Sequence, residues 1–351
     1  MSVLIVGGYG TVGTVIASNL PEESVIIAGR SEARARKLAA ELGARWRVLD
    51  VTKPLDDDEI LAGVDCVVMC LDLADTAFVQ EVFRRGIDYV DISAEYPILS
   101  AVASLDALAR QHGSAAVLSV GLVPGLSNLM ARHSLRYVDP IEHFDSAILA
   151  GLGEKHGVAG SSWILAHLND CLGQRRFEFR EPYGRKTAHR FAFSDQYTLP
   201  QTLPVASAAT WLGFDSFLMT QLIALARVPV LRGLFRRQAV RRFLLNSTQR
   251  FQFGSDEFVL ATQAYGQKGR YQAWLRGRRE AVATGLVAAE VVRRMQEQRP
   301  SAGVHHIEQV FQLEDFLPLL EQHGMSFADS LTDQRSGEAI GSVPERVLKK
   351  V

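Results

Sequence analysis

The first 21 residues contain the feature that most restricts how this chain can fold: an apolar run, a glycine-rich loop and a helix pattern in direct succession. The apolar run is Val3–Val6, the loop is the G-x-G-x-x-G sequence from Gly8 to Gly13, and the helix pattern of residues 11–20 stops at Pro21. Glycines recur by chance, but a strand before this loop and a helix after it are the context in which it binds the pyrophosphate of a dinucleotide. We therefore expect a dinucleotide site here.

Each glycine of the loop has a physical reason. Gly8 permits the tight turn, Gly10 lets the backbone approach the pyrophosphate, and Gly13 lets the helix pack closely on the strand. The first N–H groups of the helix have no intrahelical partner, so they can donate to phosphate oxygens. The residues expected to contact the dinucleotide here are Gly8, Tyr9, Gly10, Thr11, Val12 and Gly13.

Short apolar runs and helix patterns alternate through the first 130 residues. Further strands are expected at residues 25–28, 46–49, 66–71, 89–92 and 116–120. Helices are expected at residues 32–42, 57–61, 74–85 and 101–112. Strand–helix–strand units of this length require parallel strands joined by right-handed crossovers. The sequence thus predicts an α/β Rossmann domain, with a doubly wound parallel sheet, over residues 1–130.

The residue after the second strand indicates which dinucleotide binds. An NAD-binding domain usually has an acid here for the ribose 2′-hydroxyl, whereas this chain has Arg30 and then Ser31. A guanidinium can make a forked, charge-assisted contact with a 2′-phosphate and stack on adenine, and the Ser31 hydroxyl can donate as well. Arg34 lies one helical turn further on. We predict NADP as the cofactor; the alternative is that Arg30 is only a solvated residue at a strand end.

The other strand ends supply further candidate contacts, because ligands of open parallel sheets gather at the carboxyl ends of the strands. Asp50 and Val51 follow the third strand, where an adenine would lie. Cys70 and Leu71 end the fourth strand, on the nicotinamide side. Gly121 follows the sixth strand. The cofactor-binding residues expected at these ends are Asp50, Val51, Cys70, Leu71 and Gly121.

From about residue 141 the pattern changes. Residues 251–265 and 270–278 alternate like strands on either side of Gly266–Gly269, which predicts a hairpin. Residues 142–150 and 176–193 are also strand-rich, and helices are expected at 163–172 and 216–226. We expect an inserted α+β domain, for substrate binding or dimerisation, on a mostly antiparallel sheet over residues 131–280. Residues 281–330 are expected to be helices that return to the Rossmann domain, and 331–351 a loosely held tail.

Composition excludes several classes of protein. Apolar residues make up 47% and charged residues 22% of the chain, and the formal net charge is −1, so nothing favours disorder or nucleic acid as a partner. The N-terminus lacks the pattern of a secretory signal, and the longest apolar stretch, residues 217–226, is far shorter than the roughly 20 residues that span a bilayer. The three cysteines form no disulfide framework, and no histidines have ligand spacing, so no metal is expected. We predict a cytoplasmic protein.

These motifs resemble the saccharopine dehydrogenase (saccharopine reductase-like) family. The resemblance rests on residues 6–13 (VGGYGTVG), 28–31 (AGRS), 89–95 (YVDISAE) and 121–128 (GLVPGLSN), and on the helix 281–298 with the turn 303–305 after it. It implies an NADP-linked Rossmann domain, an inserted α+β domain, often a homodimer, and hydride transfer at a C–N centre of an amino-acid substrate. The chain departs from the family at Val123, where members often have an acid, and across the middle domain.

Catalytic and substrate-binding candidates follow from the same logic. Lys155 and His156 lie in a glycine-flanked loop after an apolar run, and one of them can serve as the acid or base beside the hydride carbon. The alternative is a charged surface loop. Glu95, with Asp91 and Ser93 at the end of the fifth strand, can face a substrate ammonium or cap the next segment. The substrate-binding residues expected are Glu95, Pro124 and Gly125, the last two at a helix start near the nicotinamide.

Residues 213–250 combine seven arginines and one acid with an apolar face. We interpret them as helices that cover the active site or a dimer contact, rather than as a surface that rests on anionic lipid. The function predicted from the sequence is an NADP-dependent oxidoreductase acting on an imine or secondary amine of a small metabolite. Two alternatives stay open: a carbonyl reductase of another small metabolite, and a non-catalytic NADP-binding sensor or scaffold.

Overall fold

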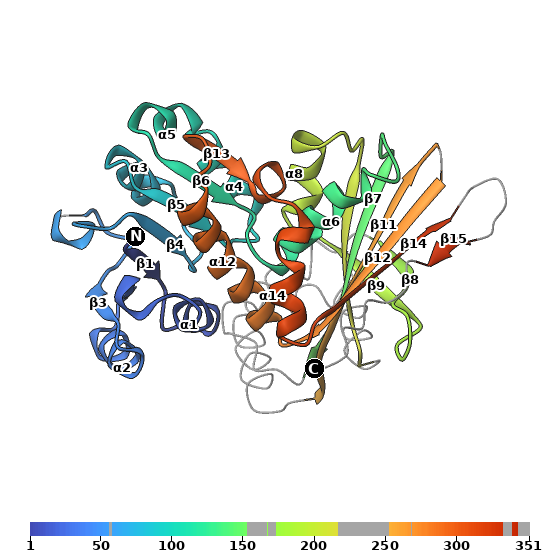
Figure 1. Cartoon of the computed structure of the whole chain (residues 1–351), viewed down its shortest axis with the longest axis horizontal. Coiled ribbons are helices and arrows are strands. Elements are labelled where there is room, and N and C mark those ends of the chain that lie inside the picture. Colours follow the sequence, from blue (N-terminus) through green and yellow to red (C-terminus); the bar gives the residue numbers. More distant parts are fainter. Residues whose placement is uncertain are drawn as a thin grey trace, which may run out of the picture. The chain divides into compact units, whose positions relative to one another are not determined.

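The computed structural model describes residues 1–55, 58–152, 167, 173–216, 253–267, 269–332 and 339–342. The chain forms two compact units, in colours that follow the sequence in Figure 1. Unit 1 comprises Met1–Leu129 and Ala281–Gln312, and unit 2 comprises Met130–Glu280 and Leu313–Val351. The chain therefore leaves unit 1 after Leu129, returns to it for residues 281–312, and then enters unit 2 a second time.

Unit 1 is built on a parallel sheet of seven strands. The strands are β1 (Val3–Val6), β2 (Val25–Gly29), β3 (Arg45–Val48), β4 (Cys66–Met69), β5 (Asp88–Asp91), β6 (Ala115–Leu118) and β13 (Gly303–His306). Their order in the sheet is β13-β6-β5-β4-β1-β2-β3, and every neighbouring pair is parallel. The order reverses between β1 and β4, which is the switch point of a doubly wound sheet. The predicted Rossmann sheet is confirmed.

Helices join these strands. They are α1 (Thr11–Ser18), α2 (Glu32–Leu42), α3 (Ala77–Arg84), α4 (Tyr96–Ala103) and α5 (Asp106–His112). The expected helix 57–61 is a single 3₁₀ turn, η2 (Asp58–Ile60), and the expected helix 101–112 is divided between α4 and α5. The break lies at Ser104, whose hydroxyl donates to the Ala101 carbonyl at 2.6 Å, a local bond that competes with helix continuation.

The burial of the strands of unit 1 explains why their positions could be predicted from the sequence. All four residues of β1, β4, β5 and β6 are buried, because a parallel sheet is covered on both faces. Helix α3 adds a buried apolar stripe to the same core cluster. Its members are Phe78, Val79, Val82 and Phe83. Such strands appear in the sequence as continuous apolar runs rather than as alternating ones.

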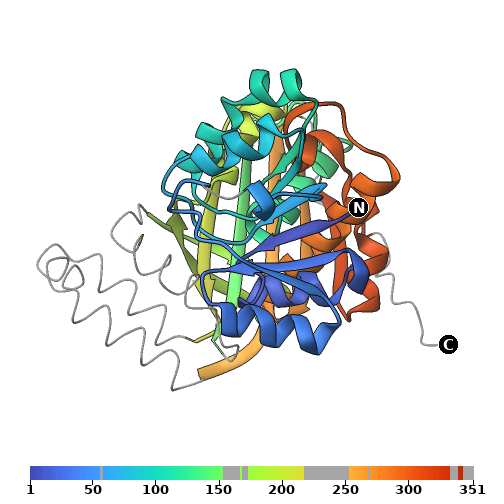
Figure 2. The ribbon, with the colours of Figure 1, turned by 90° about the vertical axis from the view of Figure 1, so that its left-hand side faces the viewer.

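The returning segment of unit 1 is a helix followed by a strand. Helix α12 (Glu280–Glu297) lies beside α1, as Figures 1 and 2 both show. A Cβ built on Gly285 would lie 2.6 Å from the Val15 Cβ, so the two helices approach closely at this glycine. Residues 303–305, expected as a turn, belong instead to β13, which pairs with β6. The Val304 N–H donates to an Asp106 carboxylate oxygen at 2.9 Å, which holds this short edge strand in place.

Unit 2 is built on an eight-stranded mixed sheet in the order β15-β14-β12-β11-β7-β10-β9-β8. The strands are β7 (His143–Leu152), β8 (Gln174–Glu178), β9 (Arg185–Phe191), β10 (Ala208–Phe214), β11 (Phe253–Gly266), β12 (Gly269–Arg278), β14 (Ser326–Thr332) and β15 (Ala339–Ser342). Only β7 and β10 pair in parallel among the pairs described. The mostly antiparallel sheet and the β11–β12 hairpin closed at Gly266 and Gly269 are both as predicted.

The structure differs from our expectation over residues 313–330, which belong to unit 2 and not to the Rossmann domain. They contain η5 (Leu313–Asp315), helix α14 (Leu317–Gln322) and most of β14. Two polar contacts hold them there: His133 Nδ1 lies 2.8 Å from Glu314 Oε1, and the buried Tyr271 hydroxyl donates to Asp329 Oδ2 at 2.5 Å. Residues 339–342, expected in a loose tail, pair as β15 with β14.

Unit 2 also contains helix α8 (Asp195–Thr202), which the sequence analysis did not predict, while the helices expected at 163–172 and 216–226 lie almost entirely outside the described residues. Of the helices that the structure describes, none combines the length and apolar composition needed to cross a lipid bilayer.

Candidate dinucleotide site

The loop between β1 and α1 is closed by its own backbone. The Gly7 N–H donates to the Ala28 carbonyl at 2.9 Å, which ties the loop to the end of β2. The Gly8 N–H donates to the Ile5 carbonyl at 3.1 Å, and the Gly10 N–H to the Gly7 carbonyl at 2.8 Å. Gly7 has a φ of +80°, a left-handed conformation that glycine adopts without a steric cost. The turn after β1 is therefore as tight as the glycine pattern requires.

Close packing explains the remaining glycines of the loop. A Cβ on Gly13 would lie 2.6 Å from the Gly7 carbonyl oxygen, and a Cβ on Gly8 would lie 2.8 Å from the Ile5 carbonyl oxygen. Gly10 is the N-cap of α1, and no side chain caps this end of the helix. The first turn of α1 thus presents its N–H groups as an anion site of the kind that binds a pyrophosphate.

Arg30 and Ser31 lie at the end of β2, as predicted, but in different roles. The Arg30 side chain is exposed, and within the described part of the chain its guanidinium makes no hydrogen bond or ion pair. Ser31 is the N-cap of α2, where its hydroxyl accepts a 3.4 Å hydrogen bond from the Arg34 N–H. The Arg30 guanidinium is therefore exposed at the end of β2, and the Ser31 hydroxyl, which accepts from α2, keeps its O–H to donate.

Arg34 is exposed and contacts the phosphate loop itself. Its guanidinium lies 4.4 Å from the centre of the Tyr9 ring and donates to the Tyr9 carbonyl at 3.2 Å. Asp50, after β3, accepts two hydrogen bonds from Thr52. These bonds, with the positive charge of Arg30 among the smaller causes, lower the pKa of Asp50. Val51 packs partly against the core of unit 1, so it contributes an apolar surface beside Asp50.

At the end of β4, Leu71 is the residue brought to the phosphate loop. A Cβ on Gly7 would lie 2.8 Å from Leu71 Cδ2, so this exposed side chain lies directly against the loop. Cys70 donates its backbone N–H to the Val6 carbonyl at 2.9 Å. Burial, with the Asp91 carboxylate as a second cause, raises the pKa of the Cys70 thiol. The thiol is therefore neutral near pH 7 and is not an activated nucleophile.

The end of β5 contains a buried carboxylate. Asp91 is 1% exposed and accepts hydrogen bonds from the Tyr89 hydroxyl at 2.6 Å and from the Ser93 N–H at 2.7 Å. Burial raises the pKa of Asp91 from 3.8 to about 6. The sequence places Asp91 and Ser93 where they could face a substrate. Both are buried, and Asp91 is bonded within its own strand end, so Glu95 is the acid of this segment that lies at the surface.

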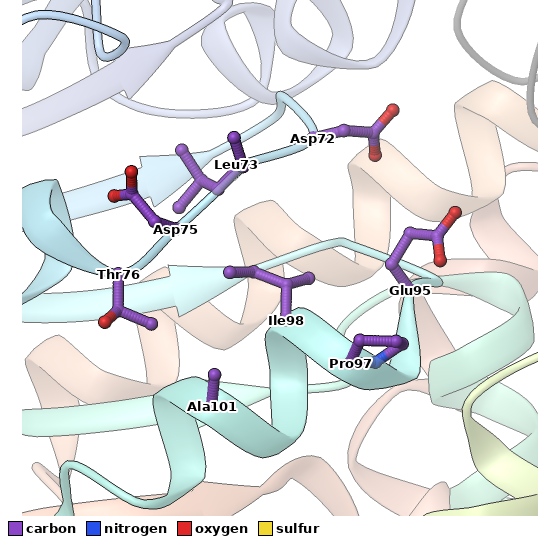
Figure 3. Close-up of a pocket in the computed structure, with 9 residues that line it drawn as sticks. Asp72, Leu73, Asp75, Thr76, Glu95, Pro97, Ile98 and Ala101 are labelled. Carbon is purple, nitrogen blue, oxygen red and sulfur yellow. The ribbon is translucent and has the colours of Figure 1, made fainter.

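A pocket of about 460 Å³ opens between the segments after β4 and β5. Its floor is apolar and its rim is acidic, as Figure 3 shows. The carboxylates of Asp72 and Glu95 lie at one end of the pocket, and Asp75 lies with Thr76 at the other. None of the nine described residues that line it is basic. Electrostatically, a cationic group fits this pocket better than an anionic one.

The segment after β6 forms a buried turn, η3 (Leu122–Leu126), which leads into α6 (Ser127–Ser134). Pro124 and Gly125 are buried, and the Gly125 N–H donates to Asn128 Oδ1 at 3.1 Å. A substrate carboxylate at this amide would therefore have to displace Asn128. Gly121 is also buried, and a Cβ on it would lie 3.1 Å from the Thr284 Cγ2 of α12. The returning helix is thus part of the wall at the end of β6.

Two residues at this sheet edge were missed by the sequence analysis. The Ser119 hydroxyl and His306 Nδ1 lie 2.8 Å apart, which joins the end of β6 to the end of β13. Burial lowers the pKa of His306, so the imidazole is neutral near pH 7. Ser119 has a φ of +58°, rare for a serine. The two residues are 187 positions apart, and the only hint in the sequence was the pair His305–His306 after a glycine.

The predicted catalytic residues Lys155 and His156 lie outside the described residues, as does nearly all of the basic and apolar stretch at 213–250. The structure therefore gives them no position. The described part of the site is the edge of unit 1 formed by the carboxyl ends of its parallel strands.

At this edge the strand order reverses between β1 and β4, and a glycine loop leads into a helix, α1, whose first turn has no side-chain cap. These features define a Rossmann domain of the dinucleotide-binding class. Within that class, residues 3–117 match the family model described as Saccharopine dehydrogenase NADP binding domain. The family resemblance predicted from the sequence is confirmed over this part of the chain.

Two solved structures support the fold of the whole chain. One is apo saccharopine dehydrogenase (L-Glu forming) from Saccharomyces cerevisiae, with 16% sequence identity, a TM-score of 0.68, and coverage of 94% of this chain and 99% of that one. The other is a homospermidine synthase from Legionella pneumophila in complex with NAD, with 12% identity, a TM-score of 0.64, and coverage of 92% and 89%. A comparison of the sequence with curated proteins found no match.

Proposed function

We propose that this protein is an NADP-dependent oxidoreductase that transfers hydride to or from a C–N centre, an imine or a secondary amine, of a small amino-acid-like metabolite. The observation that most supports NADP is the exposed guanidinium of Arg30 at the end of β2, beside the phosphate loop and unpaired among the described residues. A 2′-phosphate could accept hydrogen bonds from this guanidinium, which has a Coulombic interaction with Asp50 but no hydrogen bond among the described residues. With Arg34 one turn further on, the adenosine end of the site has two positive charges.

The remaining parts of the site follow the same proposal. The pyrophosphate would lie at the first turn of α1, and the nicotinamide near Cys70, Leu71 and Gly121, at the ends of β4 and β6. The acidic pocket with Glu95 and Asp72 suits the ammonium group of an amine-bearing substrate. Lys155 or His156 would supply or accept the proton as hydride transfer changes the charge at the C–N centre. By resemblance to the family we also propose a homodimer.

The cofactor proposal is tested by Arg30→Asp, with affinities for NADPH and NADH measured by fluorescence titration. The substitution removes a charge-assisted contact and adds repulsion, so NADPH affinity should fall roughly 10- to 100-fold. NADH lacks the 2′-phosphate, so its affinity should change much less. Arg36→Asp is the matched control, because it makes the same change of charge on an exposed position of α2. A wild type that prefers NADH, or equal losses for both cofactors, would contradict the proposal.

The nature of the reaction needs a separate assay. NADPH oxidation with a panel of imines and of matched carbonyl compounds distinguishes a C–N oxidoreductase from a carbonyl reductase. The reverse reaction is tested with the product amines and NADP⁺. Tight NADPH binding without turnover of any of these compounds would favour a sensor or scaffold over an enzyme.

A further inference from the structure

Tyr9 lies between the phosphate loop and the first turn of α2 and contacts both. Its hydroxyl accepts a hydrogen bond from the Ser31 N–H at 3.0 Å. Its ring lies under the Arg34 guanidinium, 4.4 Å from ring centre to Cζ, and its carbonyl accepts from Arg34 Nη2 at 3.2 Å. Tyr9 thus contacts the backbone of Ser31 and the side chain of Arg34, both at the proposed adenosine end of the site.

The space for this ring is provided by Gly29, the last residue of β2. A Cβ at position 29 would lie 2.5 Å from Tyr9 Cε1 and 2.6 Å from the Tyr9 hydroxyl oxygen. A side chain at this position would therefore displace the ring from Arg34. Gly29 and Tyr9 form a matched pair, and the pair fixes where the ring can lie.

Arg30 and Arg34 differ in whether their guanidinium groups are held by the protein. Arg34 is held at the phosphate loop by a cation–π contact and a hydrogen bond, whereas Arg30 makes neither kind of bond within the described residues. Holding a long side chain in one place before a ligand binds removes part of the entropy cost of binding. The guanidinium of Arg34 still has donors left for a phosphate after its bond to the Tyr9 carbonyl.

We propose that Tyr9 is a positioning residue that determines selectivity for the 2′-phosphate of NADP by holding Arg34 at the adenosine end of the site. This inference rests on the proposed NADP dependence. It adds that selectivity depends on a residue of the phosphate loop and not only on the arginines after β2. If Tyr9 only shaped the pyrophosphate loop, its loss would weaken NADP and NAD equally.

The test uses the full chain and two binding probes, 2′,5′-ADP and 5′-ADP, measured by titration calorimetry. Tyr9→Leu removes the aromatic face, so affinity for 2′,5′-ADP should fall about fivefold while that for 5′-ADP changes less than about twofold. Tyr9→Phe is the matched control, because it keeps the ring and the backbone carbonyl. It should retain the wild-type preference within about twofold.

A double-mutant cycle tests whether Tyr9 acts through Arg34. Arg34→Gln leaves the loop in place and should itself lower the preference for 2′,5′-ADP; in that background Tyr9→Leu should add no further loss. An unchanged preference in Arg34→Gln, a further loss in the double variant, or equal losses for both probes in Tyr9→Leu would each overturn the inference. Equal affinity of the wild type for the two probes would instead overturn the NADP proposal itself, and this inference with it.

Discussion

The buried carboxylate of Asp91 makes the stability of this protein depend on pH in a direction that can be measured. The group is 1% exposed at the end of β5, and its pKa is raised from 3.8 to about 6 because burial disfavours the charged form. The hydrogen bonds from Tyr89 and Ser93 lower the pKa but do not cancel the effect of burial. The ionised side chain is therefore less stable in the folded chain than in the unfolded one.

The sign follows from the protons bound in each state. Between pH 3.8 and about 6 the folded chain keeps a proton on Asp91 that the unfolded chain has released. The free energy of unfolding therefore falls as pH rises through this window, and the penalty remains above it. A difference of about two pKa units corresponds to about 3 kcal/mol at neutral pH.

Substitution of Asp91 by Asn isolates this contribution, since an amide does not titrate. Urea unfolding followed by far-UV circular dichroism at pH 4, 5, 6 and 7 gives the difference in unfolding free energy between Asp91→Asn and the wild type. We expect this difference to move by about 2.4 kcal/mol in favour of the variant from pH 4 to pH 7, because the unfolded chain has already released part of the proton at pH 4. The substitution also alters the hydrogen bonds with Tyr89 and Ser93. That effect adds a constant to the difference in unfolding free energy and does not change how the difference varies with pH.

Asp72→Asn is the control for this experiment. The Asp72 carboxylate is exposed and is one of the smaller causes that raise the pKa of Asp91. Its removal should shift the inflection in the wild-type stability profile slightly toward lower pH and leave the size of the change nearly intact. A difference between Asp91→Asn and wild type that is constant over the whole pH range, or that favours the wild type as pH rises, would refute the argument.

Two further predictions concern the site. Gly13→Ala should lower the affinities for NADPH and NADH to a similar extent in a fluorescence titration. The new methyl group would lie 2.6 Å from the Gly7 carbonyl oxygen and would displace the loop at which we place the pyrophosphate of either cofactor. A loss of affinity for one cofactor alone would contradict this. Lys155→Met or His156→Asn should lower turnover at least tenfold with NADPH affinity unchanged, as expected for an acid or base outside the dinucleotide site; unaltered turnover in both variants would exclude the loop from catalysis.

The glycine loop and the strand before it, which form the candidate dinucleotide site, were predictable because contacts within a short stretch of chain constrain their sequence. The strand Val3–Val6 is buried on both faces, so it appears as an uninterrupted apolar run, and the glycines after it are required by contacts only a few residues away. Arg30 could be found in the same way, at a fixed distance along the chain from the glycine loop. Local rules of this kind need no knowledge of the rest of the fold.

The elements that were missed depend on distant partners. Strand β13 has the sequence GVHH, which contains little that favours a strand, and it exists because β6 offers an edge and Asp106 accepts the Val304 N–H. Strand β14 is half polar, and its place is set by pairing with β12 and by the bond from Tyr271 to Asp329. No periodicity within either segment encodes these contacts, so a sequence pattern alone could not place them.

The return of the chain to unit 1 has a consequence for how the dinucleotide domain is completed. The matched family region ends at residue 117, yet β6 is paired on its outer side by β13, from residues 303–306. Without residues 281–312, β6 would be an unpaired sheet edge, α1 would lose the helix that packs on Val15, and Ser119 would lose His306. Thr284 of the returning helix also lies against Gly121, at the end of the sheet where we place the nicotinamide. Unit 1 is therefore completed only by chain that follows the first segment of unit 2, so residues 130–280 must be synthesised before this wall of the proposed cofactor site can form.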